Sequence, residues 1–110
     1  MIDDTLAKIE ARLEGADALK DDKRRELIEL LARLRAEVAE LSKTHGEQAQ
    51  SIAGFTELSA HEATREQKNS RLLDLSLTGL SSSVQEFEKT HPKLVQIVNA
   101  ISQTLANLGI

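Results

Sequence analysis

The sequence contains no cysteine, tryptophan or tyrosine, and its one proline is Pro92. Without cysteine, neither a disulfide framework nor thiolate chemistry is available, which fits a reducing compartment. Phe55 and Phe87 are the only aromatic residues, although strands favour aromatic side chains. One proline and five glycines are too few to separate many strands. The composition therefore predicts an all-α protein.

Neither sign of charge dominates the sequence, because the formal net charge is only −4 over 110 residues. No segment is strongly basic, which disfavours a nucleic-acid partner. The run Lys23-Arg24-Arg25 is flanked by acids, so we interpret it as a solvated first helical turn. The N-terminus is acidic and shows no export signal. The charge-free residues 94–110 include several amides and fall short of the roughly 20 apolar residues of a spanning helix. We expect a cytoplasmic protein that does not enter a membrane.

What the sequence does contain is a globular balance of 40% hydrophobic and 29% charged residues. This balance differs from that of disordered chains, which are poor in apolar residues and high in net charge. A chain of this length can bury a core without metal or disulfide support. We predict one helical-bundle domain over residues 1–110.

Two amphipathic helices are predicted in the N-terminal third. Residues 3–14 place Leu6, Ile9 and Leu13 on one face. Residues 22–43, with Asp21 as the cap, carry an apolar seam whose members alternate four and three residues apart, as in a coiled coil. The seam consists of Leu27, Leu31, Leu34, Val38 and Leu41. The short connection at residues 16–20 predicts an antiparallel hairpin.

Residues 46–89 allow two interpretations, because the apolar stripe that begins with Ile52, Phe55 and Leu58 is interrupted from Ser59 to Arg71. Either the polar middle forms a bend or loop near Asn69 and Ser70, or one long helix continues and finds its partner on another subunit. We favour the continuous helix, because the middle contains neither proline nor glycine. Weak helix formers at residues 79–83 also predict a local break. With the bend near Asn69, this places any break of the helix near residues 69–82.

A sharp corner is expected at His91, because Pro92 suits the first position of a helix and pushes the preceding residue out of helical geometry. The following helix is predicted to end at Gly109, and it has no charge after Lys93. Its seam consists of Leu94, Val98, Ile101, Leu105 and Leu108. Val95 and Ile97 widen the apolar arc beyond what one neighbouring helix covers. We therefore predict a bundle completed by a second copy, as a two-fold homodimer.

The stretch Phe87-Glu88-Lys89-Thr90-His91-Pro92, followed by a charge-poor helix that ends Leu108-Gly109-Ile110, resembles a family of short bacterial proteins, the domain of unknown function 4404. The specific similarity covers residues 84–110, with looser agreement over residues 2–41, and this chain has a longer middle at residues 45–71. The resemblance implies an N-terminal helical hairpin, a variable middle, the Phe-Glu-x-x-His-Pro corner and a terminal helix. It implies no activity, cofactor or substrate.

Two residue spacings in the sequence are similar to those of known metal sites. Glu88-x-x-His91 has the spacing of di-iron carboxylate bundles, but only one copy is present and Pro92 disturbs the helical geometry. We interpret His91 as fixing the corner and Phe87 as anchoring it. His61-Glu62-Ala63-Thr64-Arg65 begins like a zinc-protease helix, but Arg65 replaces the second ligand.

We therefore predict no catalytic residue, cofactor or metal site. The leading hypothesis is a non-enzymatic structural or protein-interaction module that forms a homodimer, with a protein partner docked on residues 46–89. The alternative is a small metal-binding bundle that uses Glu88 and His91.

Overall fold

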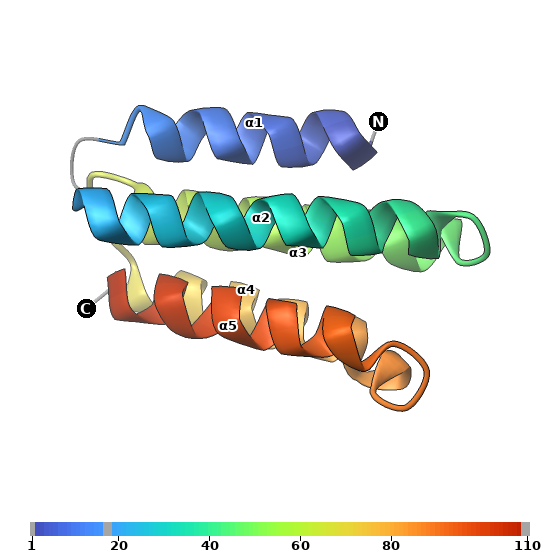
Figure 1. The fold of residues 1–110 in the computed structure, drawn as a ribbon. Helices are drawn as coiled ribbons and strands as arrows, with labels where there is room; N and C mark the ends of the chain where they lie inside the picture. The colour runs from blue at the N-terminus through green and yellow to red at the C-terminus, as the bar shows by residue number, and fades with distance from the viewer. Residues whose placement is uncertain (1, 17–18, 109–110) are drawn as a thin grey trace.

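Five α-helices and one 3-10 turn make up the regular structure of this protein in the computed structural model (Figure 1), which describes residues 2–16 and 19–108, with side chains from Asp4 onward. The helices are α1 (Ile2–Glu14), α2 (Asp21–Ser42), α3 (Gly46–Thr64), α4 (Ser70–Val84) and α5 (Pro92–Leu108). The 3-10 turn η1 (Gln85–Phe87) precedes the last corner. These described ranges contain no strand, and the all-α prediction is confirmed.

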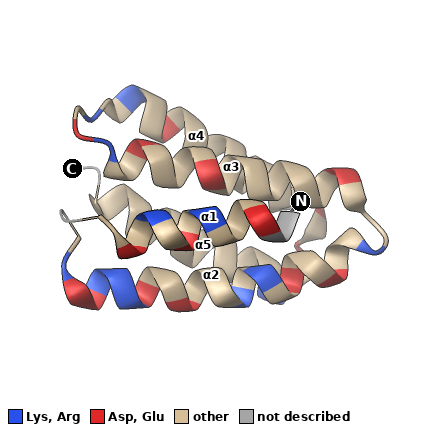
Figure 2. Cartoon of the chain, turned by 90° about the horizontal axis from the view of Figure 1, so that it is seen from above, with Lys and Arg blue, Asp and Glu red and all other residues tan. Residues whose placement is uncertain are grey.

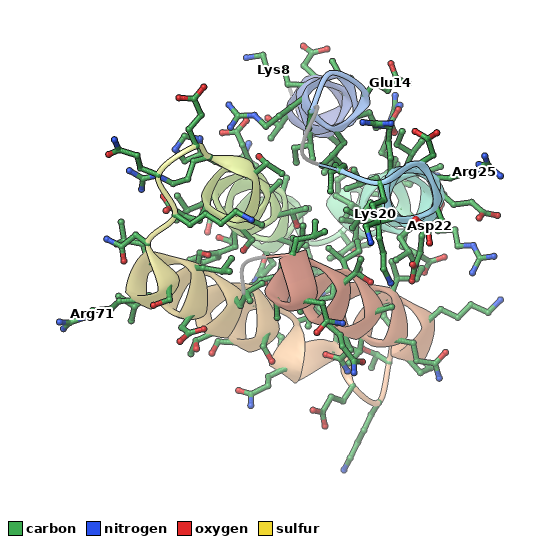
Figure 3. The ribbon with its side chains drawn as sticks, turned by 90° about the vertical axis from the view of Figure 1, so that its left-hand side faces the viewer. Lys8, Glu14, Lys20, Asp22, Arg25 and Arg71 are labelled. Carbon is green, nitrogen blue, oxygen red and sulfur yellow. The ribbon has the colours of Figure 1, made fainter. Side chains whose placement is uncertain are left out.

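The helices lie in three layers, and each runs roughly antiparallel to the one before it (Figures 1 and 3). α1 packs over α2 and α3, and α4 and α5 form the layer on the opposite side. α3 contacts all four other α-helices. The Cα radius of gyration is 12.9 Å, close to the roughly 13 Å of a compact chain of about 100 residues. The buried side chains accordingly form one continuous core.

Both predicted seams fill this core, because their spacing keeps each apolar row on one helical face. The α2 seam is at most 1% exposed at every position from Leu27 to Leu41. The α5 seam is buried to the same extent from Leu94 to Leu105, and Leu108 is half-buried. Gly109, predicted to end this helix, lies outside the described residues. Asp21 is not the cap of α2: Lys20 holds that position, and Asp21 opens the first turn.

The continuous helix predicted for residues 46–89 is wrong. α3 ends at Thr64, Arg65 is extended (φ −69°, ψ 153°), and the Asn69 side chain caps α4 by accepting a hydrogen bond of 3.1 Å from the Leu72 amide. The intervening residues have no large apolar side chain that would hold a helix on the core, and reversing the chain lets α4 pack along α3. The partner of this segment is therefore in the same chain.

The local break predicted at residues 79–83 is also wrong, because α4 stays helical to Val84. The hydroxyls of Ser76 and Ser83 donate hydrogen bonds of 2.8 and 2.6 Å to carbonyl oxygens one turn earlier, so these polar groups are satisfied inside the helix. Gly79 has a packing role: a Cβ atom there would lie 2.3 Å from Cε1 of Phe55. The aromatic ring of α3 thus rests directly on the backbone of α4.

The wide apolar arc of α5 is covered by its own chain. α5 packs against α2, α3, α4 and η1, and Val95 and Ile97 are half-buried within this arrangement. The second subunit that we predicted on the strength of this arc is therefore not needed at α5. None of the described helices is both long and apolar enough to cross a lipid bilayer.

Candidate functional site

Three rings meet at the end of the bundle where α2 joins α3 and α4 joins α5. Phe87 is 3% exposed, and its ring centroid lies 5.3 Å from that of His45 and 5.5 Å from that of His91, both edge to face. Each histidine Nδ1 lies within hydrogen-bond distance of the preceding threonine hydroxyl, 2.8 Å at His45 and 3.0 Å at His91. Pro92 is the exposed first residue of α5. The predicted corner is confirmed. His45 also packs against Phe87 at this corner, a contact between distant residues that nothing in the sequence indicated.

Glu88 and His91 do not come together as a metal centre in the described part of the chain. Glu88 is exposed, whereas the His91 ring faces Phe87 and Thr90. Across residues 2–16 and 19–108, no three histidine or acidic side chains are grouped closely enough to hold a metal ion. A single Glu–His pair lacks the further carboxylates that a bundle needs for a di-iron site.

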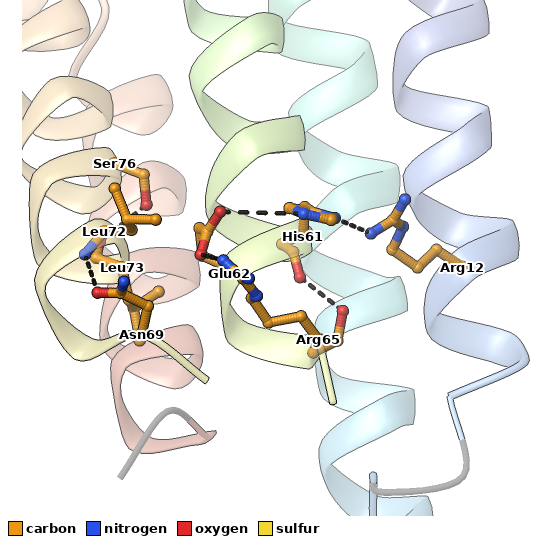
Figure 4. Close-up of polar contacts among 10 residues, drawn as sticks. Arg12, His61, Glu62, Arg65, Asn69, Leu72, Leu73 and Ser76 are labelled. Carbon is orange, nitrogen blue, oxygen red and sulfur yellow. Dashed lines mark hydrogen bonds and ion pairs between the residues drawn. The ribbon is translucent and has the colours of Figure 1, made fainter. Parts of the chain in front are cut away.

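A series of polar contacts connects α1 with α3 (Figure 4). Arg12 Nη1 lies 2.6 Å from His61 Nδ1, and His61 Nε2 lies 3.9 Å from a carboxylate oxygen of Glu62. Because a guanidinium can only donate, Arg12 is the donor of this contact and His61 Nδ1 the acceptor. The contact fixes the orientation of the imidazole ring.

Glu62 is the buried charge of this series, with a side chain only 6% exposed. Arg65 Nη1 donates a hydrogen bond of 2.8 Å to Glu62 Oε1, one helical turn away. A carboxylate removed from water needs such a partner, because desolvation disfavours its charged form. Arg65, at the position of the missing zinc ligand, thus neutralises its neighbour at the end of α3. The contact between Arg12 and His61 joins α3 to α1.

The main surface feature is a group of large hydrophobic side chains on α3 and α4. Phe55 and Leu58 are 36% and 46% exposed on α3, and Leu72 and Leu75 are 42% and 59% exposed on α4. Residues three apart share a helical face, so each helix presents one pair. We call the surface formed by these four side chains the α3–α4 face. The sequence placed Phe55 and Leu58 in the same stripe as Ile52, which is buried.

The helix α4 has few charged residues. Arg71 and Asp74 are its only ones, whereas basic and acidic residues cover the outside of α2 (Figure 2). α3 carries three acids, Glu47, Glu57 and Glu62, and no lysine or arginine. Arg71 extends away from the bundle into solvent (Figure 3). α5 is also poor in charge, with Lys93 as its one charged residue, so the exposed apolar side chains rather than the low charge distinguish the α3–α4 face.

Open grooves on the other side of the molecule have a different character. The groove between α2 and α5 is lined by side chains of both charge signs and by two apolar residues: Arg33, Ala36, Glu37, Lys93, Gln96 and Ile97. Opposite charges in one open groove are typical of a solvated surface. The α3–α4 face is therefore the stronger candidate for a contact.

Comparison with known proteins gives one result for this chain. A family model described as a domain of unknown function, DUF4404, matches residues 29–110, from the middle of α2 through the Phe-Glu-x-x-His-Pro corner to the C-terminus. No curated protein and no solved structure matches the chain.

Proposed function

We propose that this chain, which belongs to the DUF4404 family, is a non-enzymatic module of the cytoplasm that acts through protein–protein contact as a homodimer. The observation that carries the proposal is the α3–α4 face. Exposed apolar residues scattered singly are normal on any protein, whereas a cluster on two adjacent helices is typical of a contact surface.

The engagement of the polar side chains supports the non-enzymatic part of the proposal. His45 and His91 contact Phe87 and their neighbouring threonines, and His61 is bonded to Arg12. Glu62 is paired with Arg65. These contacts give the side chains structural roles: at the corner around Phe87, between α1 and α3, and at the end of α3.

Light scattering after gel filtration tests the proposal directly. We expect twice the chain mass of 12.1 kDa at tens of micromolar protein. The mass should hold in high salt, because contacts between apolar surfaces are not screened as ion pairs are. A mass of 12.1 kDa at every concentration would contradict the homodimer.

The metal-binding alternative through Glu88 and His91 gains no support from their separate surroundings. Elemental analysis of the purified protein, followed by melting with and without a chelator, distinguishes the two functions. Stoichiometric metal together with a lower melting temperature after chelation would replace the proposal with the alternative.

A further inference from the structure

We infer that the homodimer forms by hairpin exchange: the α4–α5 hairpin of each copy leaves its own α2–α3 hairpin and packs in the same way on that of a second copy. The inference rests on the proposed function and adds the interface, the partner and the segment that moves. Exchange of an identical element between copies is a low-cost route to a dimer, because the contacts of the closed chain are made again.

Two units of the chain meet along one interface. The first unit consists of α1, α2 and α3, with α1 packed on the other two helices, and the second unit consists of α4, η1 and α5. The units meet where α3 lies along α4 and where α5 packs against α2 and α3 (Figure 3). Residues 65–69 connect the two units. Exchange therefore requires a new backbone conformation in this connection and nowhere else.

Each hairpin is closed by its own turn. The His45 amide donates a hydrogen bond of 2.8 Å to the carbonyl oxygen of Leu41, and the His91 amide donates one of the same length to that of Phe87. Both hairpins thus keep these bonds when the units separate. The hairpins also repeat the same buried residues 46 positions apart: Leu27 and Leu73, Leu34 and Leu80, and Val38 and Val84.

The interface between the units is apolar, so an opened chain requires a partner. Ile101 and Leu105 of α5 are 1% exposed and line one interior space with Leu27 and Leu31 of α2. Phe55 of α3 rests on the backbone of α4. Separating the units exposes these side chains to water, which the hydrophobic effect opposes. A second opened copy offers the same surfaces to cover them, which selects this chain as its own partner.

The side chains of the connection leave it free to act as the hinge. Arg65 bonds to Glu62 within the first unit, whereas the Asn69 side chain caps α4 and Lys68 Nζ donates a hydrogen bond of 2.5 Å to the carbonyl oxygen of Leu108, both within the second unit. All three contacts therefore survive a change of backbone angles at residues 66–67, which are exposed. A few such residues are enough to absorb a hinge motion.

Exchange builds the α3–α4 face from both copies. Phe55 and Leu58 of one copy then lie beside Leu72 and Leu75 of the other, and the dimer presents two such faces. The homodimer thus keeps an apolar surface for protein contact, and each of its faces is completed by the second copy.

The first experiment links the two units covalently. The chain has no cysteine, so a pair of cysteines can be introduced without competition. Glu26 and Thr104 belong to different units, and their side-chain oxygens lie 3.4 Å apart. A short bis-maleimide should join the cysteines of Glu26→Cys/Thr104→Cys between copies in an exchanged dimer, which a denaturing gel shows as a covalent dimer. In a dimer formed by surface contact, the same pair is joined within one chain.

The matched control places the cysteines within the first unit. Arg12 and His61 are in contact at 2.6 Å, and both belong to that unit. Arg12→Cys/His61→Cys should therefore run as a monomer on the denaturing gel, whether or not hairpins are exchanged. We expect the covalent dimer fraction of the Glu26→Cys/Thr104→Cys variant to equal the dimer fraction that light scattering measures before cross-linking.

The second experiment shortens the hinge. Deleting residues 66–69 leaves Arg65 alone between α3 and α4, whereas antiparallel neighbouring helices are joined by two to five residues. The shortened chain cannot fold back on itself, so we expect a dimer at every concentration, including those at which the unmodified protein is partly monomeric. Replacing Glu66-Gln67 by Gly-Ser keeps the length of the connection and should still allow the monomer.

The outcomes separate the inference from the function on which it rests. If the unmodified protein is dimeric and Glu26→Cys/Thr104→Cys gives only cross-linked monomer, the hairpins are not exchanged, and the proposed homodimer stands on a surface contact. A shortened chain that folds as a monomer contradicts the exchange as well. An unmodified protein that is monomeric throughout overturns both the proposed function and this inference.

Discussion

Arg24 of α2 donates a hydrogen bond of 3.1 Å from Nε to the carbonyl oxygen of Leu13, which lies in the last turn of α1. Its Nη2 also donates to the carbonyl oxygens of Ala16 and Leu19, at 2.6 and 3.1 Å. The last carbonyl groups of a helix have no partner within that helix. One side chain from α2 therefore satisfies carbonyl groups at the end of α1 and along the connection that follows it. Our interpretation of this arginine as part of a solvated turn was wrong.

Replacing Arg24 by alanine should destabilise the protein, because three carbonyl oxygens lose a charged donor. We expect the free energy of unfolding to fall by about 1.5–3 kcal/mol, the usual range for hydrogen bonds to charged groups. Arg25→Ala is the control, since Arg25 is exposed on the same turn and should change the stability by less than about 0.5 kcal/mol. Urea denaturation measures both, and equal losses would contradict the capping role.

Gly79→Ala should change the stability in opposite directions in the unmodified chain and in the Phe55→Ala variant. Alanine is favoured over glycine inside a helix by about 1 kcal/mol, but here its Cβ displaces the Phe55 ring. We expect a loss of stability in the unmodified chain and a gain of about 1 kcal/mol in the Phe55→Ala background. Thermal melting of the four proteins of this cycle measures the coupling. The same change in both backgrounds would show that the ring yields without cost.

Removing Arg65 alone should destabilise the protein more than removing both members of the Glu62–Arg65 pair. Arg65→Ala leaves the Glu62 carboxylate buried without its cation, and we expect a loss of about 1–2 kcal/mol, reduced by the partial exposure of Arg65. Glu62→Met in the Arg65→Ala background removes the unpaired charge and should recover most of that loss. Chemical denaturation at neutral pH compares the variants, and a further loss in the double variant would argue against an unpaired-charge effect.

Ile101 should tolerate neither truncation nor charge, because it is 1% exposed and lines the same interior space as Leu27 and Leu31. Ile101→Ala should lower the free energy of unfolding by about 2–5 kcal/mol. Ile101→Asp should prevent folding, which circular dichroism detects as a loss of helix. Leu75→Ala, on the exposed α3–α4 face, is the control and should leave the helical signal unchanged.

The local features of the helices could be read from the sequence. The seams of α2 and α5 repeat at helical spacing, and burying such a row is the dominant favourable term of folding. Pro92 marks the start of α5 because proline lacks the amide hydrogen that interior positions need. The Phe-Glu-x-x-His-Pro motif also indicated the family correctly.

The course of residues 46–89 could not be read in the same way. Small residues such as Ala60 and Ala63, both 1% exposed, line the buried side of α3, and Ala60 borders side chains of α1, α2 and α5. A periodicity count gives such residues little weight, so the stripe looked interrupted and the segment looked like one long helix. The reversal at residues 65–69 depends on contacts between two helices, which no single window of sequence contains.

The sequence by itself determined that the chain is helical and that the apolar rows of α2 and α5 are buried, because these follow from residues within a few turns of one another. Only the tertiary structure decided which apolar residues remain at the surface. Phe55 and Leu58 belong to the same stripe as Ile52 in the sequence, but once α4 packs along α3 the stripe divides into a buried row and an exposed face. The contact between the helices, rather than the pattern in either one, produces the surface on which the proposed function rests.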